Sequence, residues 1–198
     1  MNKILAFTAL SATFVFTGCV KTTAFDFFSS DTYYEKAVSN MQKVSLMRDM
    51  ETKALLHAVY LNNVDPHIYS GDEYFYVAIH IIEDAYDPKR HGLKNLDYRL
   101  KMVKNLTPAE SDDLTKVPGY DNEEITEGPE EKKSVVLMDP IEATELDEEH
   151  KLRRTMPIRQ QWNHFYIVRY NEVNASELTL SFENDQYGKV QLKFQKEK

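Results

Sequence analysis

The chain has 198 residues, of which 12% are aromatic and 28% charged, and its formal net charge is −8 at pH 7. This acidic balance argues against nucleic acid as a partner and against a basic patch for anionic membrane surfaces. Cys19 is the only cysteine, so no internal disulfide can stabilise the fold, and a packed core must do so instead.

The first 18 residues have the three parts of a secretory signal. Lys3 supplies a positive charge, residues 4–16 form an uncharged apolar stretch, and Thr17 and Gly18 are small. The apolar stretch is shorter than the about 20 residues that a membrane-spanning helix needs. We therefore expect residues 1–18 to be a signal peptide that is removed from the mature protein.

The cysteine directly after this segment makes residues 1–19 resemble the signal of a bacterial lipoprotein. Thr17, Gly18 and Cys19 fit the lipobox of that family, whereas Phe16 stands where an aliphatic residue is usual. The resemblance implies that the thiol of Cys19 receives a diacylglycerol, that cleavage occurs before it, and that the new amino group is acylated. Two or more acyl chains are enough for stable anchoring without a spanning helix.

The same resemblance implies an address in the cell envelope. In enterobacterial lipoproteins an Asp after the cysteine tends to retain the product at the inner membrane, and Val20 stands in that place here. We therefore expect a lipid-anchored protein of the outer membrane that faces the periplasm or the cell surface. Residues 19–30 would form a tether, and residues 31–198 a single β-rich domain.

The domain is expected to begin with one helix and to continue in strands. Thr32 and Glu35 fit a capping box, and the spacing of the apolar residues that follow predicts a helix over roughly 32–47. Within a later strand-like segment, successive side chains must point to opposite faces, so we expect Phe75 in the core and Tyr74 and Tyr76 on the other face. That face could bind protein or glycan, but we expect it to lie beneath a second layer. The strand-like segments are 54–62, 74–82, 96–102, 135–138 and 162–170.

The clearest pattern lies at the end of the chain. Apolar residues alternate with polar ones over 178–183 and again over 190–195, with a polar turn between the two runs. This alternation predicts an antiparallel hairpin with one face in the core and one face in water. Several short strands without alternating helices favour a mainly β, immunoglobulin-like antiparallel β-sandwich, with a small β-barrel as the alternative.

One segment stands apart in charge. Between Ala109 and Lys151 the chain has 15 acidic and 3 basic residues, a net charge of −12. Prolines and glycines interrupt the same stretch, which is typical of a loop rather than of core. We therefore predict an acidic loop or insertion over about 108–150, a solvated segment rather than a cation-binding site.

Asn174 is a candidate modification site. The segment from Glu172 to Ser176 resembles the extended sequon of bacterial oligosaccharyltransferases, which has an acidic residue two positions before the asparagine. Asn105 has only the short form, with Val103 in the acidic position. Because Asn174 lies between two predicted strands, we expect a surface loop to present it for N-glycosylation in a host that has the enzyme.

No sequence motif indicates catalysis or a cofactor. The chain lacks a Gly-x-Ser-x-Gly nucleophile elbow and a glycine-rich phosphate loop, and its carboxylates do not follow the EF-hand pattern. The six histidines have no metal-ligand spacing. His57, His80 and His164 each lie in a predicted strand and could meet on a sheet, but packed or surface histidines are expected rather than a metal site.

These observations favour a non-catalytic interaction or structural module of the envelope, held by acyl chains on Cys19 and binding an envelope protein. Two alternatives remain open: a carrier of a lipid or other small ligand with an apolar cavity, and a hydrolase whose active-site residues are scattered along the chain. A closed core would argue against the carrier. A concave pocket with convergent histidine and carboxylate groups would favour the hydrolase.

Overall fold

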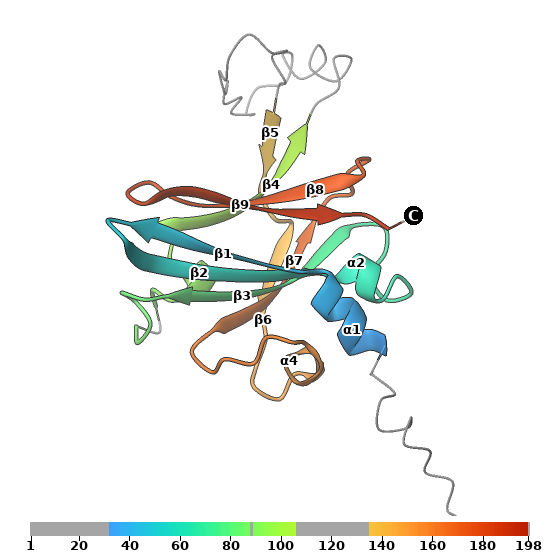
Figure 1. Cartoon of the computed structure of the whole chain (residues 1–198), viewed down its shortest axis with the longest axis horizontal. Helices are drawn as coiled ribbons and strands as arrows, with labels where there is room; N and C mark the ends of the chain where they lie inside the picture. The colour runs from blue at the N-terminus through green and yellow to red at the C-terminus, as the bar shows by residue number, and fades with distance from the viewer. Residues whose placement is uncertain (1–31, 88, 106–134, 198) are drawn as a thin grey trace, which may run out of the picture. The chain divides into compact units, whose positions relative to one another are not determined.

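The computed structural model describes residues 32–87, 89–105 and 135–197 (Figure 1). The strands in these ranges are β1 (Met41–Arg48), β2 (Glu51–Tyr60), β3 (Glu73–Ile81), β4 (Tyr98–Asn105), β5 (Val135–Met138), β6 (Glu142–Glu145), β7 (His164–Tyr170), β8 (Glu177–Asn184) and β9 (Gly188–Gln195). The helices there are α1 (Thr32–Ser39), α2 (Leu61–Val64), α4 (Lys151–Thr155) and the 3-10 helix η2 (Gly92–Lys94). None of the helices described has the length and hydropathy needed to cross a membrane.

The strands form two antiparallel sheets. One sheet has the order β1-β2-β3-β7-β6 and the other the order β5-β4-β8-β9. Strand β1 of the first sheet lies against β9 of the second (Figure 1). Within the described ranges neither sheet closes on itself, so the domain is a β-sandwich and not a small barrel. The prediction of a mainly β, antiparallel sandwich with one N-terminal helix is confirmed.

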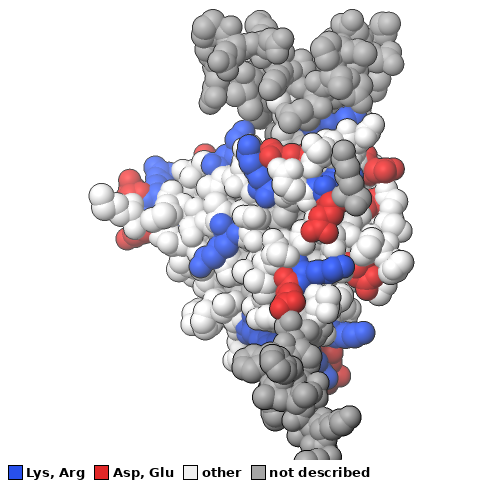
Figure 2. All heavy atoms as spheres, turned by 45° about the vertical axis from the view of Figure 1, so that its right-hand side comes forward, with Lys and Arg blue, Asp and Glu red and all other residues white. Residues whose placement is uncertain are grey.

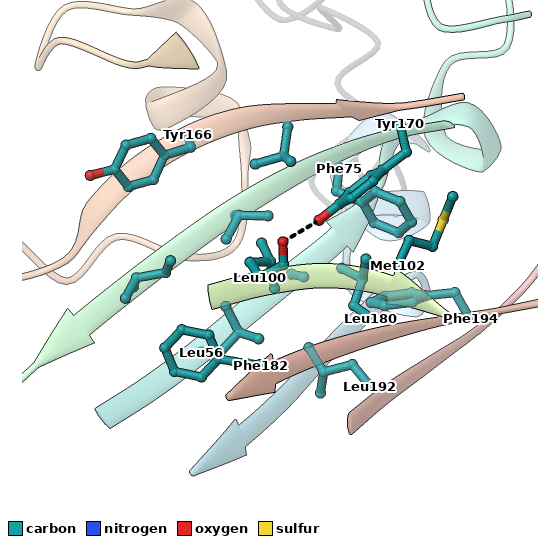
Figure 3. Packing of buried hydrophobic residues seen from close by; sticks show 14 of the residues in the cluster. Leu56, Phe75, Leu100, Met102, Tyr166, Tyr170, Leu180, Phe182, Leu192 and Phe194 are labelled. Carbon is teal, nitrogen blue, oxygen red and sulfur yellow. Dashed lines mark hydrogen bonds between the residues drawn. The ribbon is translucent and has the colours of Figure 1, made fainter. Parts of the chain in front are cut away.

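The main core lies between the two sheets and follows from the two-residue period of the strands. Phe75, Val77 and Ile79 of β3 all point into it and are fully buried. The hydroxyl of Tyr170 donates a hydrogen bond of 3.2 Å to the carbonyl oxygen of Leu100, which satisfies a polar group inside the core (Figure 3). The facing wall consists of apolar residues from β4, β8 and β9: Leu100, Met102, Leu178, Leu180, Phe182, Leu192 and Phe194.

A second, smaller core covers the other face of the five-stranded sheet, beneath the short helices (Figure 1). Tyr76 and Phe165 stack there with ring centroids 5.7 Å apart. Ala37 of α1, Leu61 of α2 and Leu152 of α4 are buried against the same face. The expectation that Tyr76 lies beneath a second layer is confirmed.

The predicted helix over 32–47 is wrong in its second half. Helix α1 ends at Ser39, and the chain continues as strand β1. Met41 packs against the outer layer, whereas Val44 packs against the main core. A strand with apolar residues on both faces can show the same three-residue spacing as one face of a helix, and this led to the wrong assignment.

The segment predicted as an acidic loop, about 108–150, contains two strands. Residues 108–134 lie outside the described residues. Strand β5 pairs with β4 and matches the strand predicted over 135–138, whereas β6, which pairs with β7, lies where a loop was predicted. Val136 and Leu146 are buried. All residues of β6 are exposed, so no apolar pattern of its own specifies that strand, and its backbone pairing with β7 does.

The C-terminal hairpin is confirmed. Strands β8 and β9 pair in antiparallel register from Glu177 with Gln195 to Asn184 with Gly188. Gly188 has φ +89°, a left-handed conformation that glycine adopts without strain, so the turn can close between the two strands.

Candidate functional site

Two histidines and a glutamate converge beside the end of the five-stranded sheet. His91, Glu145 and His164 each offer one nitrogen or oxygen atom of the metal-ligand type, and these atoms all lie within 4.8 Å of one another. Nδ1 of His164 is 3.3 Å from Oε1 of Glu145. The rings of His91 and His164 are stacked, with centroids 3.5 Å apart and planes inclined by 17°. We call these three residues the His–Glu cluster.

The pairing of β6 with β7 brings two members of the cluster together. Glu145 lies opposite Tyr166 in the register of the two strands. His164 precedes Tyr166 by two residues and therefore points to the same face. Because Tyr166 belongs to the main core, this is the inner face of the sheet. His91 reaches it from the residue before η2, a short helix that lies against β3 and β4.

A close backbone approach holds η2 against β7. Gly92 has φ +56°, and a Cβ atom added there would collide with the hydroxyl of Tyr166 and stand 3.0 Å from Cβ of His164. The backbone amide of Leu93 donates a hydrogen bond of 3.2 Å to the same hydroxyl. Glycine at this position therefore lets His91 lie directly against His164.

Lys94 forms an ion pair with the carboxylate of Glu145, which also contacts His164. Its Nζ is 2.7 Å from Oε2 of Glu145, so the two oxygens of Glu145 have different partners. Burial works to raise the pKa of Glu145, but hydrogen bonds from Lys94 and His164 outweigh it and lower that pKa. Burial and the nearby His91 lower the pKa of His164 against the opposing hydrogen bond with Glu145. At neutral pH we therefore expect a charged Glu145 beside a neutral His164.

His91 is the least satisfied member of the cluster. It is only 8% exposed, and its Nδ1 has no hydrogen-bond partner among the described residues. A buried polar atom left without a partner costs about 1–3 kcal/mol. Two imidazoles and a carboxylate are also a ligand set that suits Zn²⁺. Among the described residues, these three form the group that could hold a metal.

Only one of the three strand histidines singled out in the sequence joins the cluster. Nδ1 of His80 is instead 3.1 Å from the carbonyl oxygen of Trp162. His57 lies opposite Lys43 of β1, and its burial and the charge of Lys43 lower its pKa.

The sequence alone does not indicate that His91 and Glu145 are partners of His164. His91 and Glu145 are 54 residues apart, and a further 19 residues separate Glu145 from His164. One of the two precedes a short 3-10 helix and the other ends an exposed edge strand. No local spacing motif could link residues so far apart, and only the register of β6 and β7 reveals the pair.

The other two residues singled out in the sequence lie away from the cluster. Cys19 falls outside the described residues. Asn174 is exposed in the loop between β7 and β8, as expected for a modifiable asparagine. The neighbouring Val173 is buried, and its amide donates a hydrogen bond of 2.9 Å to Oε1 of Glu73, so this loop is fixed to the domain beside the exposed asparagine.

A groove of about 450 Å³ opens on the other face of the five-stranded sheet, along β6. Aromatic, aliphatic and charged side chains share its walls, and Arg169 forms ion pairs there with Glu142 and Asp72. Of the His–Glu cluster, only Glu145 lines this groove. The residues lining it are Tyr69, Tyr74, Glu142, Thr144, Glu145, Leu146, Asp147, His150, Ile167 and Arg169.

Comparisons of the chain with protein-family models, with curated proteins and with solved structures found no match. The fold places this chain among the antiparallel two-sheet β-sandwich proteins, with helices over one face of one sheet. Its function must therefore be argued from the residues themselves.

Proposed function

We propose that this chain is a lipid-anchored protein of the bacterial cell envelope that acts as a non-catalytic interaction or structural module. The observation that carries the proposal is the lipobox-type sequence ending in Cys19, ahead of a β-sandwich domain. With no second cysteine, lipidation gives this thiol a role that disulfide pairing cannot. Val20 favours the outer membrane.

The packing of the core supports a module rather than a carrier. The ring of Phe75 has its centroid 5.2 Å from that of Tyr60, 6.0 Å from that of Tyr170 and 5.3 Å from that of Phe194. Rings at such separations are in contact, so side chains fill the space between the sheets at this place. A carrier needs an apolar cavity of about 300–1,000 Å³. The groove along β6 opens at the surface, and Glu142, Glu145 and Arg169 share its walls with apolar side chains.

The His–Glu cluster does not by itself favour a hydrolase. A hydrolase places its reactive groups around a pocket that admits the substrate. Of the cluster, Glu145 alone lines the neighbouring groove. We therefore keep the non-catalytic function as the proposal.

The charge distribution supports a protein partner rather than nucleic acid. Figure 2 shows Lys and Arg side chains interspersed with Asp and Glu side chains over one face of the described residues, without a broad basic field. Nucleic-acid-binding surfaces carry such a field, because phosphate contacts dominate their affinity.

Metabolic lipid labelling of the wild type and of two variants in the native host tests whether Cys19 is the lipid anchor. Wild type and Phe16→Leu, which restores an aliphatic residue to the lipobox, should both incorporate labelled palmitate, and Cys19→Ala should incorporate none. Absence of label from wild type, or label retained by Cys19→Ala, would overturn the anchor.

Affinity recovery from detergent-solubilised envelopes tests the module. Wild type and Phe16→Leu should return the same protein partner in repeated preparations, and an unrelated domain on the same lipobox should not. If no partner is recovered reproducibly, the proposal that the domain is an interaction module is contradicted. The proposal that Cys19 carries the lipid anchor is not affected.

A further inference from the structure

We propose that the His–Glu cluster, formed by His91, Glu145 and His164, is a binding site for a divalent transition-metal ion, with Zn²⁺ as its natural occupant. The three ligand-type atoms already lie within 4.8 Å of one another. In a tetrahedral zinc site with ligand distances of about 2.0–2.2 Å, neighbouring ligand atoms stand roughly 3.4 Å apart. The separation of 3.3 Å between Nδ1 of His164 and Oε1 of Glu145 has this value.

An unpartnered nitrogen in the same place points to a missing ligand. His91 is more than nine-tenths buried, its ring lies on that of His164, and its Nδ1 has no hydrogen-bond partner in the described part of the chain. In the described residues Nε2 of His57 and the hydroxyls of Tyr76 and Ser181 are also buried without a partner, but only His91 lies in a group of ligand-type atoms. A bound ion or water usually accounts for such an atom. A metal ion coordinated by the cluster would satisfy His91 without adding any protein group.

His164 and Glu145 are exposed enough to complete the geometry. The two stacked imidazoles cannot both aim their lone pairs at one ion, so binding must turn at least one ring about its χ2 bond, a torsion with a broad minimum in histidine. The side chains of His164 and Glu145 are 27% and 33% exposed, so this side of the cluster is open to solvent and an ion can reach it.

The surroundings resemble the outer shell of known metal sites, in which ligands are held by further hydrogen bonds. Lys94 binds Oε2 of Glu145, whereas Oε1 contacts Nδ1 of His164, and an ion bound between these two atoms would replace that contact. Tyr166 fixes η2 through the amide of Leu93 and thereby fixes the approach of His91. The ligands thus sit on segments that are tied to one another before any metal binds.

The number of ligands defines the kind of site. Structural zinc sites have four protein ligands, whereas three protein ligands leave one position for water or for an atom from another molecule. The His–Glu cluster provides three. The proposed ion therefore has an open coordination position on the solvent side, and the site does not depend on the lipid anchor.

Zinc titration of the whole mature chain tests the site. The protein is prepared without a histidine tag, with Cys19→Ser in every arm to remove the thiol, and is stripped with a chelator before Zn²⁺ is added in a calorimeter. We expect about one equivalent of Zn²⁺ to bind. Glu145→Gln and His164→Ala should each weaken binding by about 100-fold or more, since each removes a direct ligand. Zinc should raise the Tm of the parent chain but not the Tm of these two variants.

Matched variants separate this site from adventitious binding. His80→Ala, on the neighbouring strand β3, should leave the affinity unchanged. Glu145→Gln preserves side-chain shape, so it remains informative if His164→Ala does not fold. No binding by the parent chain, equal binding by Glu145→Gln, or equal loss in His80→Ala would each overturn the proposal.

Discussion

The hydroxyl of Tyr166 on strand β7 accepts a hydrogen bond of 3.2 Å from the backbone amide of Leu93 in helix η2. This contact joins segments 73 residues apart in the chain. It fixes the short helix that follows His91 to the strand that carries His164. The His–Glu cluster therefore depends on one side-chain-to-backbone contact and on the glycine beside it.

Gly92→Ala should destabilise the domain by about 2–5 kcal/mol. The left-handed backbone costs an alanine roughly 1–2 kcal/mol, and the collision of its Cβ with the hydroxyl of Tyr166 adds about 1–3 kcal/mol. Urea unfolding followed by circular dichroism measures the change. In a Tyr166→Phe background, where the colliding oxygen is absent, the same substitution should cost less.

Gly71 provides the control for this substitution. Its φ is +85°, but a Cβ there would meet no atom within 4 Å. Gly71→Ala should therefore show the backbone cost alone, about 1–2 kcal/mol. If Gly71→Ala and Gly92→Ala lose the same stability, the close approach of η2 to β7 is not what constrains Gly92.

Lys196→Met should destabilise the domain by about 3 kcal/mol. Glu73 is 1% exposed and accepts hydrogen bonds from the hydroxyl of Tyr60 at 2.6 Å and from Nζ of Lys196 at 2.7 Å. Removing the lysine leaves a buried carboxylate without its counter-charge, which is strongly unfavourable. Urea unfolding at pH 7 measures the loss.

An exposed ion pair of strand β9 serves as the comparison. Lys193 pairs with Glu177 at 3.4 Å, with side chains 66% and 40% exposed. Lys193→Met should change the stability by no more than about 0.5–1 kcal/mol, because exposed pairs contribute little. A loss at Lys193 equal to that at Lys196 would show that burial of Glu73 is not the cause.

Much of the fold could be predicted because the strands alternate so regularly. The hairpin of β8 and β9 and the inward face of β3 follow directly from the two-residue period. Strand β1 could not be predicted, because Met41 and Val44 serve two different cores and imitate helical spacing. Strand β6 could not either, since its residues are exposed and its place comes from β7.

The candidate site was largely invisible in the sequence. His164 was noticed as one of three strand histidines, but its true neighbours are Glu145 and His91. Glu145 was counted as one charge among many in a predicted loop. Contacts between residues so distant in the chain depend on strand register and on a glycine turn, which spacing rules do not capture.

Stability should fall as the pH rises from about 10 to about 12. Burial raises the pKa of Tyr98 and of Tyr166 to about 12, whereas a tyrosine in an unfolded chain titrates near pH 10. Since the folded state keeps these protons longer, their contribution is fully present below pH 10 and is lost as the pH approaches 12. Urea unfolding across this range measures the fall.

Tyrosine-to-phenylalanine substitutions show which tyrosines cause the fall in stability at alkaline pH. Tyr98→Phe should flatten the decline, because one ionisable group is removed from the core. Tyr86→Phe, at a fully exposed position, should leave the profile unchanged. A profile that is the same in Tyr98→Phe and in wild type would exclude Tyr98 as a source of the decline.

Asn174 should carry a glycan when the chain is made in a host with a bacterial oligosaccharyltransferase. It is exposed in a loop and follows Glu172 by two positions. Asn174→Gln and Glu172→Ala should each remove the glycan mass from the corresponding peptide, whereas Asn105→Gln should change nothing. Modification that persists in Glu172→Ala would mean that the acidic position is irrelevant.

The central claim is that the mature protein begins at a lipid-modified Cys19. Mass spectrometry of the N-terminal peptide, released from protein purified from membranes of the native host, measures this directly. We predict a peptide that starts at Cys19 and carries a diacylglyceryl group on its thiol, with a further acyl chain on its amino group. A mature N-terminus at another residue, or an unmodified Cys19, would contradict the account.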